Sequence, residues 1–334
     1  MRSTTGWIIY RVGQSELTEQ DYEINRLIEE AATCDIKLRV LAPAQFDLVI
    51  TRDNPKSVLL DGEAVELPDF VLPRLGAGTS YFGLAVIRQF ERLGVHVFNS
   101  SMAIETVKDK LYTYQILAQS DLPLARTMLA KFPVDTEVVG KRIGFPLVVK
   151  TISGSAGKGI FLCEEPRAFG DLVDLIGATQ PSLNIILQEF VATSQGRDLR
   201  VFTIGGRAIC AMLRESVDGS FKANISRGGK GENFPLDPKI EWLCTEVARL
   251  MGLDIAGIDL LFDGNGYKIC EANSSPGFRG LEAACSVNMA RQLLAYIMLR
   301  LGRSELYPEL FDADEKGGRN DVADLKPDKN DFKA

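Results

Sequence analysis

Apolar and polar residues over the first hundred positions follow the pattern of a small α/β unit. Short apolar runs at residues 6–12, 36–43 and 46–50 predict β-strands, and residues 18–34 carry apolar positions at helical spacing. A strand, a glycine-rich turn, a helix and a further strand follow over residues 70–100. Because strands that alternate with helices favour a parallel sheet, we expect a Rossmann-like lobe in this region.

This lobe lacks the sequence that binds a dinucleotide. Gly13 stands alone after the first strand, and no G-x-G-x-x-G motif surrounds it. We therefore expect a lobe without a cofactor, and NAD is disfavoured. Arg74 follows a later strand, at the edge where α/β sheets bind ligands, so it is a candidate for substrate binding. A surface arginine without a special function is the equally simple alternative.

A glycine-rich loop between two apolar strands lies near the middle of the chain. The first strand, residues 145–150, ends in Lys150, and the second begins after Gly159. The loop consists of small residues, among them Gly154, Ser155 and Gly157. Its N–H groups can lie against phosphates. The sequence argues against a Walker P-loop, because Lys158 is followed by glycine and the next element is a strand. A plain glycine-rich hairpin remains the alternative.

Later strands also carry polar residues. The apolar run at residues 184–191 includes Gln188 and Glu189, where backbone groups could pair with an adenine edge. Two strands then surround the turn at Gly205–Gly206, and polar side chains recur along and after them: Asp198, Arg200, Arg214, Lys222, Asn224 and Arg227. Such charges normally form a solvated face. Their recurrence in every strand that leads to the next hairpin weakens that interpretation.

The hairpin around Gly264–Gly266 predicts a metal site. A three-residue loop centred on Asn265 places Asp259 directly opposite Glu271. Asn273 follows two residues later, on the same sheet face. Two carboxylates this close repel each other unless a cation lies between them, and a set of oxygen ligands suits magnesium. Incidental acids on a solvated hairpin face are the alternative.

Composition and charge limit the classes of protein. The 334 residues are 46% hydrophobic and 25% charged, with a formal charge of −7 and a pI near 5.1, so we expect a substantial core and no general attraction to nucleic acid or anionic membranes. Six cysteines without a CxxC pair are typical of the cytoplasm, and the single His96 argues against histidine-based zinc chemistry. No signal segment and no apolar run of about 18 residues is present, so we expect a soluble intracellular protein.

The order of these motifs resembles the ATP-grasp superfamily and, within it, the RimK-type α-L-glutamate ligases. The resemblance covers roughly residues 70–300 and is carried by PRLGAGTSYFG, KDKL, PLVVKTISGSAGKGI, LQEFV, QGRDLR, FKANISRGG, AGIDLL and EANSSPG. It implies an α+β ATP-grasp fold with a Rossmann-like pre-ATP-grasp lobe. The implied divisions are this lobe at 1–100, a central subdomain with the glycine-rich loop at 101–187, a C-terminal subdomain with the metal site at 188–303, and a polar, flexible tail at 304–334.

The resemblance also implies roles for individual residues. ATP phosphates and the nucleotide would be bound by Lys110, Lys150, Gly154, Ser155, Gly157, Lys222, Ala223 and Asn224. Adenine would be bound by Gln188, Glu189, Phe190 and Val191, and the ribose by Asp198. One or two magnesium ions, or manganese, would be bound by Asp259, Glu271 and Asn273. The transferred charge would be neutralised by Lys150 and Arg214, and substrate would be bound by Arg74, Arg227 and Ser275. For Arg74 and Ser275, a structural role in a turn is the alternative.

The implied reaction transfers the γ-phosphoryl group of ATP to a carboxylate, and an amino group then attacks the acyl phosphate to form an amide. The amino acid would be L-glutamate, the acceptor a protein C-terminus, a peptide or a small metabolite, and the enzyme a homo-oligomer. Glu215 and Arg279 differ from the charges expected in ribosomal-protein-modifying relatives, so the acceptor stays open. A ligase with another acidic product, and a nucleotide-binding regulator without activity, are the alternatives.

Overall fold

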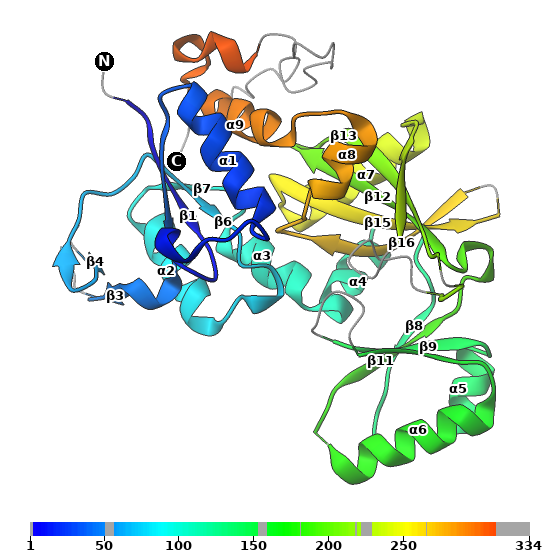
Figure 1. Ribbon diagram of the computed structural model, residues 1–334. Helices are drawn as coiled ribbons and strands as arrows, with labels where there is room; N and C mark the ends of the chain where they lie inside the picture. Colours follow the sequence, from blue (N-terminus) through cyan, green and yellow to red (C-terminus); the bar gives the residue numbers. More distant parts are fainter. Residues whose placement is uncertain are drawn as a thin grey trace.

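The N-terminal lobe contains a four-stranded parallel sheet (Figure 1). Its strand order is β2 (Lys37–Leu41), β1 (Thr5–Ile9), β6 (Phe70–Pro73) and β7 (His96–Val97). Alternate residues of β1 face opposite ways, so Ile8 packs with the apolar side of α1 (Tyr22–Thr33) and Trp7 with that of α2 (Tyr81–Arg92). The predicted Rossmann-like arrangement is confirmed.

One strand of this lobe lies elsewhere than the sequence pattern indicated. The run at residues 46–50 forms β3 (Phe46–Leu48), which pairs antiparallel with β4 (Val58–Leu60) and, through it, with β5 (Glu63–Ala64). These strands form a small separate sheet beside α2. The 3-10 turn at Pro43–Gln45 separates β3 from β2, so the chain leaves the parallel sheet there.

Gly6 is required where β1 passes the ring of Phe70. A Cβ atom at this position would lie 2.1 Å from the Phe70 Cζ atom, and Phe70 is fully buried. We expect Gly6→Ala to lower the free energy of unfolding by about 1–3 kcal/mol, because the ring has no space to move. Urea unfolding followed by circular dichroism measures this. Gly170→Ala, in a helix with no atom near the new methyl group, is the control and should not destabilise the protein.

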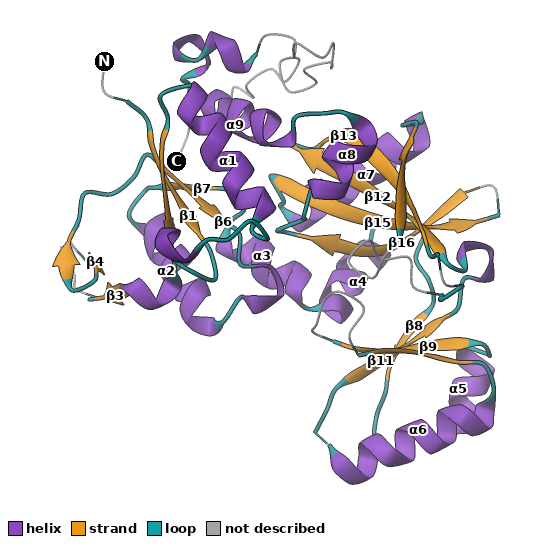
Figure 2. Ribbon diagram, in the orientation of Figure 1, coloured by secondary structure: helices purple, strands orange, loops and turns teal. Residues whose placement is uncertain are grey.

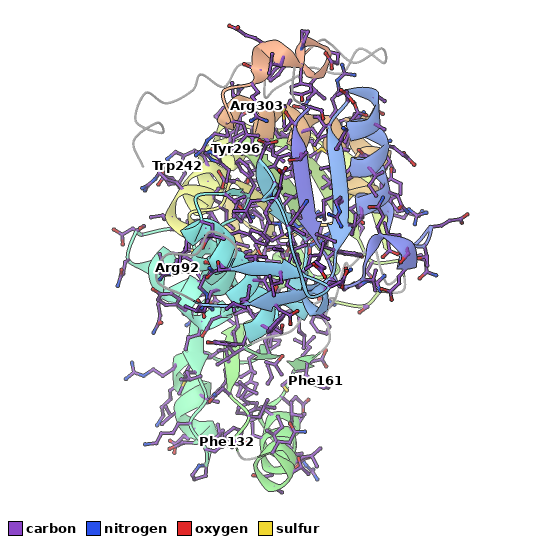
Figure 3. The ribbon with its side chains drawn as sticks, turned by 90° about the vertical axis from the view of Figure 1, so that its left-hand side faces the viewer. Arg92, Phe132, Phe161, Trp242, Tyr296 and Arg303 are labelled. Atoms are coloured by element: carbon purple, nitrogen blue, oxygen red, sulfur yellow. The ribbon has the colours of Figure 1, made fainter. Side chains whose placement is uncertain are left out.

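The central subdomain is an antiparallel sheet covered on one face by two helices (Figure 2). The strand order is β10 (Ile160–Cys163), β9 (Leu147–Thr151), β11 (Ile185–Glu189) and β8 (Thr127–Leu129). Helices α5 (Thr136–Arg142) and α6 (Pro166–Thr179) pack on Leu147, Val149 and Leu187. Figure 3 shows Phe132 and Phe161 in this part of the molecule. Because side chains alternate along a strand, Val148, Lys150 and Gln188 face the opposite side.

The C-terminal subdomain is built on a five-stranded antiparallel sheet. Its order is β14 (Lys230–Phe234), β13 (Arg207–Glu215), β12 (Arg197–Ile204), β15 (Ile255–Asp263) and β16 (Gly266–Asn273). One face packs on α7 (Pro238–Met251), with α3 (Ser101–Lys108) and α4 (Lys110–Ala118). Part of the other face packs on α8 (Arg279–Cys285) and α9 (Met289–Arg300).

From Ser100 the sequence pattern predicts one helical segment that stops at Leu122–Pro123, but the structure has two helices there. Asp109 has extended backbone angles (φ −93°, ψ 105°), and its carboxylate accepts a hydrogen bond of 3.0 Å from the Tyr112 N–H. Aspartate stabilises a helix start in this way. Lys110 is therefore the first residue of α4. Both helices pack with the core of the C-terminal subdomain, although the sequence suggested a central subdomain that begins at residue 101.

The N-terminal lobe and the C-terminal subdomain share one hydrophobic core. It contains residues from β1, α1, β12 and α9, and it extends to Tyr307 and Leu310. Arg303 donates hydrogen bonds to Thr4 (3.0 Å) and Asp69 (2.8 Å), and Figure 3 shows it near the strands of the lobe. The first residues of the expected flexible tail, 304–311, thus belong to the packed structure.

The structure is a computed structural model, and it describes residues 3–50, 57–152, 159–180, 182–217, 219–221, 229–264 and 266–311. Residues 312–334, the rest of the expected tail, lie outside these ranges. None of the helices in the described ranges has the length and apolar character needed to cross a membrane.

Candidate active site

A row of charged and polar side chains extends across one face of the five-stranded sheet. On β12, Phe202 and Ile204 point into the core shared with α9, and the same two-residue alternation places Arg200 and Asp198 further along this face. Neighbouring strands continue the row, which comprises Asp198, Arg200, Arg214, Asp259, Glu271 and Asn273. The sheet therefore brings together residues that lie up to 75 positions apart, from 198 to 273.

The predicted pairing of Asp259 with Glu271 is confirmed, but it arises differently. Near the turn, Asp263 pairs with Gly266 and Leu260 with Ile269, one residue out of the register that a loop centred on Asn265 would give. A β-bulge at Cys270 then inserts one unpaired residue, which restores the pairing of Asp259 with Glu271. The prediction of a three-residue loop was therefore wrong, and the bulge compensates for the shorter turn.

Asp259 lies at the centre of a buried network of opposite charges. Arg200 forms two hydrogen bonds with its carboxylate, one of them 2.8 Å long, and Arg214 lies 3.1 Å from the same carboxylate. Arg214 also binds Asp198 through two hydrogen bonds of 2.6 and 2.7 Å. Asp259 and Arg214 are each only 5% exposed. Because unpaired buried charges are costly, the four side chains depend on one another.

The same network shifts the pKa values of its members. Burial raises the pKa of Asp259, but Arg200 and Arg214 outweigh it and hold that pKa below its ordinary value. Burial and the nearby Asp259 carboxylate raise the pKa of Asp198, despite its contact with Arg214. The pKa of Arg214 is raised by the two carboxylates, although burial opposes this. The arginine therefore stays charged, and Asp259 is held as a carboxylate.

Glu271 and Asn273 continue the row beyond Asp259. Lys110, at the start of α4, lies 3.3 Å from the Glu271 carboxylate, and the Asn273 amide donates a 3.2 Å hydrogen bond to the Gly257 carbonyl oxygen. Among the described residues, no three His, Cys, Asp or Glu side chains are grouped as metal ligands. The donor set on this face is two facing carboxylates and one amide, which suits a hard cation such as magnesium.

Lys150 extends from the central sheet toward this row. Its Nζ atom donates a 2.6 Å hydrogen bond to the Gln188 side chain and lies 3.8 Å from the Cys270 sulfur. Lys150 is only 9% exposed. The bulge at Cys270 is fixed from behind by Tyr114, whose hydroxyl donates to the carbonyl oxygens of Ile269 and Cys270, both at 3.0 Å. The two sheets therefore approach each other where Lys150 meets the hairpin.

Glu189 joins the two subdomains at the end of β11. Its carboxylate accepts a 2.6 Å hydrogen bond from Lys268 of β16 and another of 2.6 Å from Arg126. Burial raises its pKa, but these hydrogen bonds lower it to about 2. Phe190 and Val191 follow directly, and Val191 is buried.

The depressed pKa of Glu189 predicts acid-sensitive stability. A group whose pKa is lowered on folding stabilises the protein above its unfolded pKa, 4.5 here, and loses this contribution as the pH falls toward about 2. We therefore expect the stability difference between wild type and Glu189→Gln to be constant from pH 7 to 5 and to shrink below pH 4.5. Thermal unfolding of both proteins across this range measures it, and a difference that stays constant down to pH 3 contradicts the prediction.

Arg74 lies beside the turn that follows the hairpin rather than on the surface. It is 7% exposed, and its guanidinium donates a 2.6 Å hydrogen bond to the Pro276 carbonyl oxygen. Burial lowers the pKa of Arg74, and the nearby Glu23 and Tyr10 partly offset this decrease. Ser275 lies in the same turn, one residue before Pro276, and is partly exposed. The structure thus brings these two predicted substrate residues together.

Comparison with known families gives two adjoining matches. The model described as "RimK-like ATP-grasp domain" matches residues 107–297, and the "RimK PreATP-grasp domain" matches residues 16–104. The chain belongs to the RimK-like ATP-grasp family. Membership of this family makes it an ATP-dependent ligase that forms amide bonds, as the motifs predicted.

Relatives of this RimK-like protein match more than four-fifths of its length. A protein of Legionella pneumophila (strain Corby) named "Probable alpha-L-glutamate ligase" is 34% identical over 277 residues, which are 83% of this chain and 91% of the relative. A protein of the same name from Methanococcoides burtonii is 36% identical over 277 residues, again 83% and 91% of the two chains.

Solved structures confirm the ATP-grasp fold. The ligase PsnB, solved with a precursor variant, Mg and ADP, superposes with a TM-score of 0.67 at 20% identity, over 88% of this chain and 98% of its own. D-alanine–D-alanine ligase from Bacillus anthracis gives a TM-score of 0.64 at 15% identity, over 92% and 100% of the two chains. At these identities the likeness concerns the fold alone.

Several predicted site residues of this RimK-like protein lie outside the described ranges. They are Gly154, Ser155, Gly157, Lys222, Ala223, Asn224 and Arg227. Other residues of the site were given no role from the sequence: Glu23, Asn99, Arg126, Lys268 and Arg200, the last noted only as a polar residue of its strand. Arg200 could have been found, because it shares the two-residue alternation of Asp198. The others depend on contacts between distant elements, which no local pattern reports.

Proposed function

We propose that this protein is an ATP- and magnesium-dependent ligase that joins L-glutamate to a carboxylate acceptor through an acyl phosphate. The observation that carries the proposal is the row of facing carboxylates, amide and buried cations around Asp259. The names of the relatives support glutamate as the amino acid. The acceptor is a protein C-terminus, a peptide or a small carboxylate metabolite.

The nucleotide lies between the two antiparallel sheets in this proposal. The central sheet offers Val148, Lys150 and Gln188 on the face opposite its helices, and Glu189 to Val191 border that face at the end of β11. Apolar side chains on this face would contact adenine, and backbone groups of the β11 end would pair with its edge. Lys150 would then bind phosphate, because its buried ammonium is close to the bulge of the metal hairpin.

The donor set of Asp259, Glu271 and Asn273 fits magnesium, and manganese would fit the same oxygen ligands as one or two ions. When bound, the ion neutralises charge on the ATP phosphates. The protein positions the reacting groups and supplies fixed charges that stabilise the same phosphate charge. Arg200, Arg214 and Lys110 pair with these acids in the structure, and in the proposal they would turn toward phosphate oxygens when the nucleotide binds.

The chemistry proceeds in two balanced steps. A carboxylate oxygen of the acceptor attacks the γ-phosphorus, the bond to the β-phosphate oxygen breaks, and ADP leaves. The amino nitrogen of glutamate then attacks the acyl carbon, phosphate leaves with the bond electrons, and the nitrogen loses a proton to solvent. Arg214 and Lys150 stabilise the charge that moves in the first step, and no covalent protein nucleophile is required.

The test is ADP release by purified protein with ATP and magnesium. Pools of amino acids and of acidic peptides and metabolites are added together and separately, with EDTA as the control. We expect ADP only when both substrates and the metal are present, and a product heavier by one glutamyl residue per addition in mass spectrometry. If ADP forms with another amino acid and not with glutamate, that amino acid takes the place of glutamate in the proposal. No ADP with any pool contradicts it.

A further inference from the structure

The turn that leads from the end of β16 into the first residue of α8, residues 274–279, is held by side chains of the N-terminal lobe. The hydrogen bonds that hold it are all to main-chain atoms of the turn. The Asn99 amide donates to the Ser274 carbonyl oxygen (2.8 Å), Arg74 to the Pro276 carbonyl oxygen (2.6 Å), and the Glu23 carboxylate accepts from the N–H groups of Phe278 (2.9 Å) and Arg279 (3.2 Å). Three separate elements of the lobe thus converge on six residues.

The turn packs closely against β15 and α1 at two glycines. A Cβ atom on Gly257 of β15 would lie 2.5 Å from the Pro276 Cβ atom, and one on Gly277 would lie 3.0 Å from the Glu23 carboxylate. Phe278 is fully buried, with its ring edge-on to Phe202 at a centroid distance of 6.3 Å. The turn is therefore fixed by sterics on one side and by directed hydrogen bonds on the other.

Asn99 also relates this turn to the strand that carries Asp259. Its amide donates to the Ile255 carbonyl oxygen (2.7 Å) and accepts from the Ile255 N–H (2.9 Å), in the manner of a neighbouring strand. Asn99 is 1% exposed, and its hydrogen bonds fix the start of β15 relative to the residue that follows β16. The lobe thus sets the position of Ser274 and Ser275 relative to the metal ligands.

We propose that Glu23, Arg74 and Asn99 are positioning residues that fix the 274–279 turn for binding of the amino acid and the acceptor. The inference rests on the proposed ligase function and extends it to the N-terminal lobe. Because the hydrogen bonds are to the main chain, they leave the hydroxyl groups of Ser274 and Ser275 for substrate. In the proposed function ATP lies between the central and the C-terminal sheets, and the hydrogen bonds of Glu23 go to Phe278 and Arg279 instead, so we expect ATP binding not to depend on Glu23.

Glu23 gives the sharpest test, because a conservative variant retains the contact. Glu23→Ala removes both hydrogen bonds, whereas Glu23→Gln retains an acceptor oxygen at the same place. We expect Glu23→Ala to raise the KM for the amino acid or the acceptor about tenfold, with the KM for ATP within twofold of wild type, and Glu23→Gln to recover most of the loss. Glu29→Ala, an exposed carboxylate two turns along α1, is the matched control and should match wild type.

A second measurement tests how firmly the turn is held, independently of catalysis. Hydrogen exchange followed by mass spectrometry should show the amides of Phe278 and Arg279 exchanging at least tenfold faster in Glu23→Ala, with the β12 amides unchanged. Unchanged exchange in Glu23→Ala overturns the inference, and so does a KM for ATP that rises as much as the KM for the amino acid or the acceptor. In both cases the activity of the wild-type protein still supports the proposed ligase function. Wild-type protein that releases no ADP with any pool overturns the proposed function, and the substrate role of the turn with it, whatever the exchange shows.

Discussion

We expect Asp259→Asn to lower the rate of ADP release by about 100- to 1,000-fold, the scale seen when one preorganised electrostatic contact to a reacting group is lost. The substitution keeps the shape of the side chain but removes its charge, so the hairpin has one carboxylate instead of two. It also releases Arg200 and Arg214 from their shared partner. Steady-state ADP release at saturating ATP and magnesium measures the effect.

The control for this variant lies on the same strand. Asp263→Asn removes an acid with a 46% exposed side chain, four residues from Asp259 and outside the row. We expect it to retain activity within about twofold, because exposed pairs contribute little. Thermal unfolding of both variants separates a loss of activity from a loss of folding. Equal activity of Asp259→Asn and wild type would remove the basis of the metal site.

Arg214→Met should lower the free energy of unfolding by about 3–5 kcal/mol, the range expected when one partner of a buried ion pair is removed. Asp259 retains Arg200, but Asp198 loses the guanidinium that forms two hydrogen bonds with it. Methionine fills the volume of the arginine stem, so the loss reports charge rather than a cavity. Urea unfolding monitored by circular dichroism measures it.

A double variant identifies the cause. Asp198→Asn added to Arg214→Met removes the uncompensated carboxylate, so we expect it to restore a large part of the lost stability. Arg249→Met, at a solvent-exposed pair with Glu246 on α7, is the control and should leave stability unchanged. If the double variant is less stable than Arg214→Met alone, charge compensation does not explain the network.

The architecture was largely accessible from the sequence, because helices and strands of this chain have clear apolar periodicity. That β1, β2 and β6 belong to a parallel sheet followed from the alternating strand and helix patterns, although their order in the sheet did not. Predictions were wrong where a local residue altered the course of the chain. Asp109 begins a new helix within what appeared to be one, and the 3-10 turn after β2 sends residues 46–48 to a separate sheet.

The candidate site shows the same division. The two-residue alternation places Glu271 and Asn273 on one face of β16, but Asp259 shares that face only because the bulge at Cys270 offsets a turn that is shorter than predicted. The alternation does not predict which side chains of other strands contact that face. Arg200 and Arg214 as partners of Asp259 became visible only once β12, β13 and β15 were adjacent.

The sequence by itself determined which side chains are available to the site, because the faces of helices and strands follow from the local order of residues. Only the tertiary structure decided which of them meet. Lys268 reaches Glu189, and Glu23 reaches the N–H of Phe278, across 79 and 255 positions of the chain. Such contacts depend on how whole elements pack, and the free energy that selects one packing is spread over the shared core rather than encoded in any short segment.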